Sequence, residues 1–231
     1  MWSSIRAICF DLDNTLWDVW PSILRAEQAM YAFLQERYPR IALRYSMEAL
    51  RAERERMARE QPERSHDFTY MRIATLQACA ASVGYVEPVG EQAFDVFYRE
   101  RNIVTLYRDA VPALERLKRR YRLFSLTNGN ADLSAIGLAD FFEASYAARD
   151  VGALKPDPAM FRRVLDQTGL SAGQVAHVGD DPHADVHGAR AVGMHPVWVN
   201  RTDMAWSGEH GVEPLTVRRL DELVALVEEG E

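Results

Sequence analysis

The sequence predicts an α/β fold, a doubly wound parallel sheet in which a small all-helical domain is inserted after the first strand. Three observations predict it. Residues 5–10 form a short apolar run close to the start of the chain. Residues from about 17 to 106 carry apolar side chains at helical spacing and offer no convincing strand. After residue 108, β-rich runs alternate with helical patterns, which is typical of parallel strands joined by helices.

The first strand and the helical insert can be followed residue by residue. Residues 5–10 (Ile-Arg-Ala-Ile-Cys-Phe) have the apolar, β-rich composition of a buried strand. Four helices are then expected, near 21–37, 46–60, 66–83 and 90–102. Pro39, Pro62 and the pair Gly84 and Pro88 separate them.

The second part of the chain supplies the rest of the sheet. Strands are expected at 122–126, around 144–147, at 175–178 and at 195–199. Helices are expected at 110–119, near 131–138, and at 157–168, 183–192 and 219–229, and residues 201–216 are expected to form a loop. Right-handed crossovers between these strands give a doubly wound, Rossmann-like sheet. We therefore expect an α/β core of residues 1–16 and 107–231 and a helical insert of residues 17–106.

Composition excludes several classes of protein. The 231 residues carry a net charge of −7, whereas nucleic acids and membrane surfaces recruit basic faces. No apolar run approaches the ~18 residues of a membrane helix, and the N-terminal apolar stretch is too short for a signal peptide. Cys9 and Cys79 lie far apart, so no disulfide is expected and a cytoplasmic location fits. A small-molecule partner is expected, with a monomer and a homodimer both open.

Polar side chains follow four of the expected strands. The segments are Asp11-Leu12-Asp13-Asn14-Thr15, Thr127-Asn128-Gly129-Asn130, Lys155-Pro156, and Gly179-Asp180-Asp181 with Asp185. Ligands of parallel sheets bind beyond the carboxyl ends of the strands, so these side chains should converge on one edge. A lone Asp-x-Asp after a strand usually belongs to a turn or a helix cap. Four matched strand ends favour a site instead.

Five aspartates gathered at one edge need compensation. Two like charges ~4 Å apart repel by about 4 kcal/mol at an effective dielectric near 20. Either some of the carboxyl groups are protonated or a cation lies among them, and hard oxygen ligands favour Mg²⁺. Only Lys118 and Lys155 among the 27 basic residues are lysines, so Lys155 indicates a need for a compact ammonium. Thr127 and the following turn resemble a phosphate cradle.

Together these four segments resemble the motifs of the haloacid dehalogenase-like superfamily of phosphotransferases, in order and over the whole chain, with a helical cap inserted after the first motif. The resemblance implies that Asp11 is the nucleophile and a Mg²⁺ ligand. It implies that Asp13 is the general acid and base and gives its backbone carbonyl to the metal. Attack by Asp11 would form an aspartyl-phosphate, and Asp13 would protonate the leaving alcohol and then activate water.

The other motif residues take roles from the same resemblance. Thr127 and the Asn128 amide would hold the phosphoryl group, with Thr15 as a further substrate-binding residue. Lys155 would neutralise the nucleophile and the phosphate. Asp180 would bind Mg²⁺. Asp185 or Asp181 would support the metal site without direct contact with the ion, or would orient Lys155. The expected metal site is therefore Asp11, Asp13, Asp180 and Asp185.

One position separates phosphate ester hydrolysis from halide displacement within this family. Halide-displacing members resemble the phosphatases but lack the second aspartate of the first motif, and Asp13 is present here. A mutase, or a non-catalytic regulatory protein that binds phosphate, would keep all four motifs. The intact Asp13 argues against pure binding, because binding alone requires no acid or base.

The cap is expected to determine which substrate binds. Segments such as Ser65-His66-Asp67-Phe68-Thr69 and His177-Val178-Gly179-Asp180-Asp181 resemble bacterial phosphatases of flavin biosynthesis, which implies flavin mononucleotide or 5-amino-6-(5-phospho-D-ribitylamino)uracil as substrate. Phosphoglycolate and pyrimidine nucleoside monophosphates are the alternatives. A flat ring requires aromatic or apolar faces. The candidates are Trp17, Trp20, Phe68 and Tyr70, with His66, Asp67 and Arg72 as polar partners, although such residues more often form a helix core. His183 and His187 are expected to lie on a polar helix face.

Overall fold

The computed structural model describes residues 2–209 and 211–229, which divide into two compact units. The first, the α/β unit, comprises the residues up to Asp18, Thr105–Gly129 and the residues from Gly137 onward. The second, the helical unit, comprises Val19–Val104 together with Asn130–Ile136. Residues 130–136 fall within the range expected for the α/β core, whereas their contacts place them with the helical unit.

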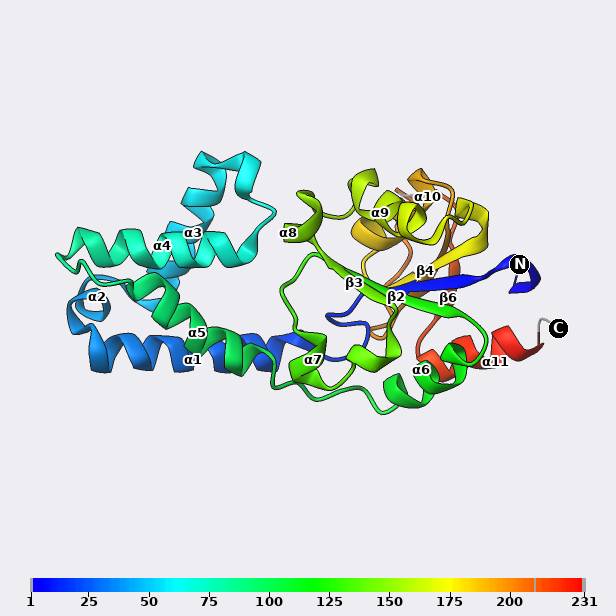
Figure 1. Cartoon of the computed structure of the whole chain (residues 1–231), viewed down its shortest axis with the longest axis horizontal. Coiled ribbons are helices and arrows are strands. Elements are labelled where there is room, and N and C mark those ends of the chain that lie inside the picture. The colour runs from blue at the N-terminus through cyan, green and yellow to red at the C-terminus, as the bar shows by residue number, and fades with distance from the viewer. Residues whose placement is uncertain (1, 210, 230–231) are drawn as a thin grey trace. The chain divides into compact units, whose positions relative to one another are not determined.

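A six-stranded sheet runs through the α/β unit, with strand order β3-β2-β1-β4-β5-β6 and every neighbouring pair parallel (Figure 1). The strands are β1 (Ala7–Phe10), β2 (Arg122–Thr127), β3 (Ala144–Ala147), β4 (Val175–Gly179), β5 (His195–Val199) and β6 (Leu215–Val217). Strand β1 lies in the middle, because Ala7 aligns with Arg122 on one side and with Val175 on the other. All four of its residues are buried, as expected of a strand covered on both faces. The doubly wound, Rossmann-like prediction is confirmed.

Helices cover both faces of this sheet. In Figure 1, α9 (Pro158–Thr168) and α10 (Gly188–Ala191) lie on one face, and α6 (Ala110–Lys118) and α11 (Leu220–Glu229) lie on the other. The short helix α8 (Ala148–Val151) follows β3 directly. Phe161 and Val164 of α9 pack with strand residues such as Cys9 and Phe124 in one buried apolar cluster. This packing holds β1 and β2 against α9.

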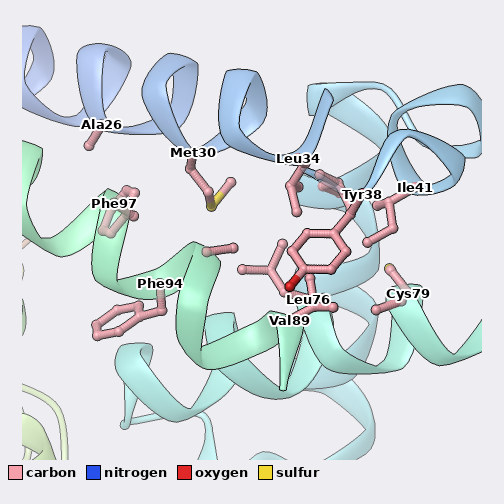
Figure 2. Close-up of a cluster of buried hydrophobic side chains, with 13 residues drawn as sticks. Ala26, Met30, Leu34, Tyr38, Ile41, Leu76, Cys79, Val89, Phe94 and Phe97 are labelled. Carbon is pink, nitrogen blue, oxygen red and sulfur yellow. The ribbon is translucent and has the colours of Figure 1, made fainter. Parts of the chain in front are cut away.

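The helical unit contains α1 (Val19–Arg37), α2 (Pro39–Arg44), α3 (Met47–Glu60), α4 (Phe68–Ser82), α5 (Val89–Arg101) and α7 (Leu133–Ile136). Figure 2 shows its apolar core, a buried cluster that contains Met30 and Leu34 of α1, Leu76 of α4 and Phe97 of α5. Ala26, Met30 and Leu34 are spaced four residues apart, so they share one face of α1.

One helix of this unit, α2, was not expected from the sequence. Four helices were expected between residues 17 and 106, and the structure has five, because Pro39 begins α2 instead of only ending α1. Proline is tolerated at the first helical position, since the N–H that it lacks would have no partner there.

A buried ionic cluster lies within the helical unit. The carboxylate of Glu27 is almost fully buried and forms ion pairs with Arg51, with Arg54 at 3.7 Å and with Arg72 at 3.6 Å. The Arg72 guanidinium also lies 3.6 Å from the centre of the Phe97 ring. Three guanidinium groups therefore share one carboxylate, and burial together with the nearby Arg54 lowers the pKa of Arg72 to about 9.

Residues 130–136 are attached to this unit by side-chain hydrogen bonds. The Asn130 amide donates to Thr69 Oγ1 at 3.2 Å and accepts from Arg101 Nε at 3.2 Å. The backbone N–H of Asp132 donates to Asn102 Oδ1 at 2.8 Å, and the side chain of Leu133 is buried. The segment that directly follows the Thr127-Asn128-Gly129 turn is thus part of the helical unit.

Three further elements, two in the α/β unit and one in the helical unit, differ from the expected ones. Residues 215–217, within or next to the expected loop, form the edge strand β6. The helix expected at 183–192 is a π-helical segment, Pro182–His187, followed by α10. The helix expected near 131–138 is only the four-residue α7. None of the helices in the described ranges is both long enough and apolar enough to cross a bilayer.

Candidate active site

Strand β1 delivers Asp11 to the carboxyl edge of the sheet. The backbone N–H of Asp11 donates to Val178 O on the neighbouring β4 at 2.8 Å, so the residue directly after the strand is still held by it. Lys155 Nζ donates to Asp11 Oδ1 at 2.6 Å and to Asp185 Oδ1 at 2.7 Å, and all three side chains are buried. A single ammonium therefore joins two carboxylates from opposite ends of the sequence.

The charges of this triad stabilise one another. Burial opposes the charged ammonium, but the two carboxylates outweigh it and raise the pKa of Lys155 above its ordinary value. Burial would raise the pKa of Asp185, but Lys155 and a hydrogen bond from His177 hold it well below the ordinary range. Lys155 and Asp185 thus form a fixed ion pair beside Asp11.

Asp180, which follows β4, completes a cluster of carboxylates. Oxygen atoms of Asp11, Asp180 and Asp185 all lie within 4.8 Å of one another. The Thr15 hydroxyl donates to Asp11 Oδ2 at 3.0 Å and lies 3.4 Å from Asp180 Oδ1. Burial, with repulsion from neighbouring carboxylates, raises the pKa of Asp11 to about 7 and that of Asp180 to about 8. For these two groups, burial and repulsion outweigh the positive charge that Lys155 supplies.

The donor set fits a hard divalent cation. Carboxylate oxygens are the ligands that Mg²⁺ prefers, and the raised pKa values of Asp11 and Asp180 mark the place where positive charge is missing. Asp185 is a poorer ligand than its position suggests, because its oxygens accept hydrogen bonds from Lys155, from His177 and from the Asp181 backbone N–H. Asp11 and Asp180 are therefore the side chains best suited to hold the ion, and Asp185 holds Lys155.

His177 is a part of the site that the sequence analysis quoted in a motif but gave no role. Its Nε2 lies 2.8 Å from Asp185 Oδ1, and burial lowers its pKa, so the ring is neutral and its Nε2–H donates to the carboxylate. Its Nδ1 has no hydrogen-bond partner among the described residues, and its ring meets the edge of Phe161. The available signal was one imidazole in the otherwise apolar run Val-Ala-His-Val.

Asn128 clamps the backbone of Lys155. Its Oδ1 accepts the Lys155 N–H at 2.7 Å, and its Nδ2 donates to the Lys155 carbonyl at 3.0 Å. The side-chain amide is thus occupied, and the group that Asn128 could offer a phosphoryl oxygen is its backbone N–H. The buried Thr127 accepts the Gly129 N–H at 2.9 Å, which closes the turn after β2.

Two of the residues expected to bind substrate have buried side chains. Trp17 is 0% exposed, and its indole Nε1 donates to Asp13 Oδ1 at 2.9 Å. Thr15 is also 0% exposed and hydrogen-bonds to Asp11. Each side chain hydrogen-bonds a carboxylate, and its part in substrate binding stays a prediction. Burial of this kind cannot be inferred from position along the chain.

The segment after Asp180 has structural roles. Asp181 caps the following π-helical segment by accepting the N–H groups of His183 and Ala184, both at 2.8 Å. His183 and His187 are exposed, and their rings stack 5.6 Å apart. The candidate metal cluster found among the described residues contains neither histidine.

The expected cap residues have different environments within the helical unit. Trp20 is 63% exposed and Phe68 is 45% exposed, so these two rings present apolar surface. Asp67 caps α4 by accepting the Tyr70 N–H, the Tyr70 hydroxyl donates to Gln61, and Arg72 belongs to the buried Glu27 cluster. His66 is half-buried two residues before the start of α4, and its part in substrate binding stays a prediction.

Comparison with known proteins shows the family of this chain. Residues 5–193 match the family model of haloacid dehalogenase-like hydrolases. The chain is 31% identical over 231 residues, 96% of each chain, to a protein of Escherichia coli strain K12 described as 5-amino-6-(5-phospho-D-ribitylamino)uracil phosphatase YigB.

Solved structures give the same fold. One, described as a 2-haloacid dehalogenase from Pseudomonas syringae pv. Tomato DC3000, superposes with a TM-score of 0.92 at 33% identity and covers 98% of this chain and 100% of its own. A HAD phosphatase from Thermococcus onnurineus superposes with a TM-score of 0.67 at 28% identity, over 96% of this chain and 98% of its own.

Proposed function

The chain belongs to the haloacid dehalogenase-like hydrolase family and is a phosphatase of small phosphorylated substrates, and we propose that it acts through a phosphorylated Asp11 with Asp13 as acid and base. The observation that carries the proposal is the contact of Lys155 Nζ with Asp11 Oδ1 at 2.6 Å. An ammonium in that place orients the attacking carboxylate and offsets its charge as an anionic phosphoryl group approaches.

The reaction has two steps. In the first, an Asp11 oxygen forms a bond to phosphorus while the bond from phosphorus to the ester oxygen breaks, and Asp13 gives its proton to the departing alcohol. In the second, Asp13 takes a proton from water, the water oxygen bonds to phosphorus, and the Asp11–phosphorus bond breaks. Asp13 ends the cycle protonated, ready for the next ester. The backbone N–H of Asn128 and the hydroxyl of Thr127 would bind the phosphoryl oxygens.

Mg²⁺ is the proposed cofactor, held by Asp11 and Asp180 and, as the family resemblance implies, by the backbone carbonyl of Asp13. When bound it supplies positive charge beside the phosphoryl oxygens. The raised pKa values of Asp11 and Asp180 support this assignment, because burial and neighbouring carboxylates oppose their ionised forms and a cation between them would favour those forms.

We propose flavin mononucleotide or 5-amino-6-(5-phospho-D-ribitylamino)uracil as the substrate. The support is the 31% identity, over nearly the full chain, with a relative described by the second of these activities. The exposed rings of Trp20 and Phe68 supply apolar surface of the kind that a flat ring system packs against.

Halide displacement is the second candidate activity, favoured by the Pseudomonas structure with a TM-score of 0.92. A halide leaves as a stable anion and requires no proton, whereas an alcohol leaving from a phosphate ester does. The presence of Asp13, with a hydrogen bond that fixes its carboxylate, therefore favours phosphate ester hydrolysis.

One panel of substrates tests both the proposed reaction and the proposed substrate. Phosphate release is measured with Mg²⁺ on the two flavin-pathway esters, phosphoglycolate, uridine monophosphate and p-nitrophenyl phosphate, and halide release is measured on 2-chloropropionate. The highest kcat/KM is expected on a flavin-pathway ester. A preference for phosphoglycolate or the nucleotide would overturn the substrate, and halide release without phosphate release would overturn the reaction.

Two variants test the covalent route. Asp11→Asn should abolish phosphate release from every ester, because an amide is a poor nucleophile. Asp13→Asn should accumulate phosphorylated protein on p-nitrophenyl phosphate, detectable by mass spectrometry, because its leaving group requires little acid while the second step still requires a base. Retained turnover by Asp11→Asn would refute the covalent route. A wild-type protein that hydrolyses none of the esters would instead indicate a regulatory protein that binds phosphate.

A further inference from the structure

The buried ionic cluster of the helical unit carries more positive than negative charge. Its one buried carboxylate, that of Glu27, is surrounded by three guanidinium groups, which belong to Arg51, Arg54 and Arg72. Two further carboxylates act on these arginines, but they belong to exposed residues, Glu48 and Glu55. Within the described part of the chain, two positive charges of the cluster therefore have no buried carboxylate to balance them.

The two oxygens of Glu27 are shared unequally among the arginines. Oε2 accepts two hydrogen bonds from Arg51, one of them from Nε at 2.7 Å. Oε1 lies 3.7 Å from a nitrogen of Arg54 and 3.6 Å from a nitrogen of Arg72, and both distances are too long for a hydrogen bond. Among the described residues, neither Arg54 nor Arg72 donates a hydrogen bond to any acceptor. Each guanidinium carries several N–H donors, so this site is short of acceptors.

A small void lies against these two guanidinium groups. The centre of a water-sized sphere can occupy about 10 Å³ of it, which is about the room that one water molecule needs. The side chains that line the void come from α1, α3 and α4, and they are Met30, Leu50, Arg54, Arg72, Thr75 and Leu76. Figure 2 labels two of them, Met30 and Leu76, in the apolar core of the unit.

The lining offers an occupant two cationic donors and an otherwise apolar wall. The hydroxyl of Thr75 donates to the Met71 carbonyl at 2.7 Å, so its proton is already engaged. The side chains of Met30, Leu50 and Leu76 have no N–H or O–H group. The donors that remain for an occupant are the guanidinium groups of Arg54 and Arg72.

Burial makes the positive charge of these two groups costly. The side chains of Arg72 and Arg54 are 11% and 28% exposed. Burial, together with the nearby Arg54, lowers the pKa of Arg72 to about 9, and burial also lowers the pKa of Arg54. Both groups still carry their charge at neutral pH. A negative charge in the void would stabilise both charged forms, because buried charges are stable when they are paired.

We propose that this void binds one monatomic anion, a halide such as chloride, against the guanidinium groups of Arg54 and Arg72. A carboxylate or a phosphate carries several oxygens that each require a donor, and most of the lining supplies none. A water molecule would leave the two guanidinium charges unbalanced. The anion site stabilises the helical unit and takes no part in the chemistry at Asp11.

A comparison of two salts tests the proposal on the full chain. Urea unfolding is measured in sodium chloride and in sodium sulfate at equal ionic strength. Sulfate is excluded from protein surfaces and stabilises folded proteins in general, so without an anion site it should stabilise at least as strongly as chloride. We expect chloride to stabilise more, with a dependence that saturates. Chloride that binds only the folded protein lowers the unfolding constant about 100-fold at 100 times its Kd.

Two substitutions in the void and one outside it locate the effect. Arg72→Met and Arg54→Met each remove one guanidinium and keep much of the apolar stem, so each should abolish the advantage of chloride over sulfate. The two salts are compared within each variant, so a general loss of stability cancels. Arg56→Met is the matched control, because Arg56 lies on the same helix as Arg54 but is exposed and paired with Glu53 and Glu60. It should keep the advantage of chloride.

Crystals grown in sodium bromide supply a direct readout, since the anomalous scattering of bromide should give a peak in the void beside Arg54 and Arg72. An advantage of sulfate, equal effects of the two salts, or a void without bromide would overturn the proposal. An advantage of chloride that survives in both Arg72→Met and Arg54→Met would also overturn it. If one of these variants does not fold, the other and the bromide crystals decide. None of these measurements involves ester hydrolysis, so failure of this proposal leaves the proposed phosphatase function untouched.

Discussion

Replacing Lys155 with methionine would leave two buried carboxylates facing each other without the ammonium between them. Lys155 Nζ lies 2.6 Å from Asp11 Oδ1 and 2.7 Å from Asp185 Oδ1, and the lysine side chain is 2% exposed. Methionine retains most of the length and apolar volume of lysine, so the substitution removes charge with little change in packing.

The magnitude follows from the geometry. Oxygens of the two carboxylates lie within 4.8 Å of each other, and two unit charges at that distance repel by about 3.5 kcal/mol at an effective dielectric of 20. Breaking a buried ion pair by removing one partner costs about 3–5 kcal/mol. We therefore expect Lys155→Met to lower the free energy of unfolding by about 3–5 kcal/mol at pH 8 without divalent cations.

The loss should depend on pH in a known direction. The pKa of Asp11 is raised to about 7 even with Lys155 present, because burial outweighs the ammonium, and removing the ammonium raises it further. A carboxyl group with a raised folded-state pKa contributes stability that is complete below its ordinary pKa and lost as pH rises through the raised value. The deficit of the variant should therefore be full at pH 8 and should shrink as the pH falls to 5.5.

Urea unfolding at pH 5.5 and pH 8 measures this directly, and Lys118→Met provides the matched control because Lys118 is the only other lysine and is exposed. The control should unfold like the wild type at both pH values. A deficit below about 1 kcal/mol at pH 8, the size expected of a surface ion pair, would refute the reasoning, as would a deficit equal at both pH values.

Three other predictions follow from the same structure. Mg²⁺ should raise the Tm of the wild type more at pH 8 than at pH 5.5, because Asp11 and Asp180, with pKa values raised to about 7 and 8 by burial, must lose their protons to bind it; equal shifts would count against this site. His177→Leu should cost about 1–3 kcal/mol in urea unfolding and lower kcat, since Asp185 loses a buried hydrogen bond; an unchanged kcat would remove His177 from the site. Glu27→Gln should destabilise the protein by about 3–5 kcal/mol, because three guanidinium groups lose their shared carboxylate; a loss as small as that of the exposed Glu60→Gln would contradict it.

Much of the architecture could be predicted because its signals are local. Strands β3 and β5 have the expected bounds, since short β-rich runs between turn residues define them. Helix α2 was missed because Pro39 both ends one helix and begins the next, and sequence pattern alone shows only the break. Strand β6 was missed because three residues at a sheet edge are too few to show alternation.

In the site too, the positions that follow from topology could be predicted, whereas the directions of the side chains could not. Convergence of Asp11, Lys155 and Asp180 follows from parallel topology, since each comes after a strand or a crossover that ends at the same edge. The roles of the supporting side chains depend on where each side chain points, which cannot be inferred from the sequence. An indole that points inward to Asp13 and an imidazole that meets a carboxylate eight residues later have no periodic signature.

The hydrogen bonds of residues 130–136 set a condition for building chimeras. An exchange that replaces only residues 19–104 with the insert of a relative would strip Asn130 of Thr69 and Arg101 and uncover the apolar side chain of Leu133. A graft intended to transfer substrate preference must therefore carry this second, shorter stretch as well, with four junctions in place of two. Its third junction falls immediately after the Thr127-Asn128-Gly129 turn, so the donor of the insert also has to match the recipient there.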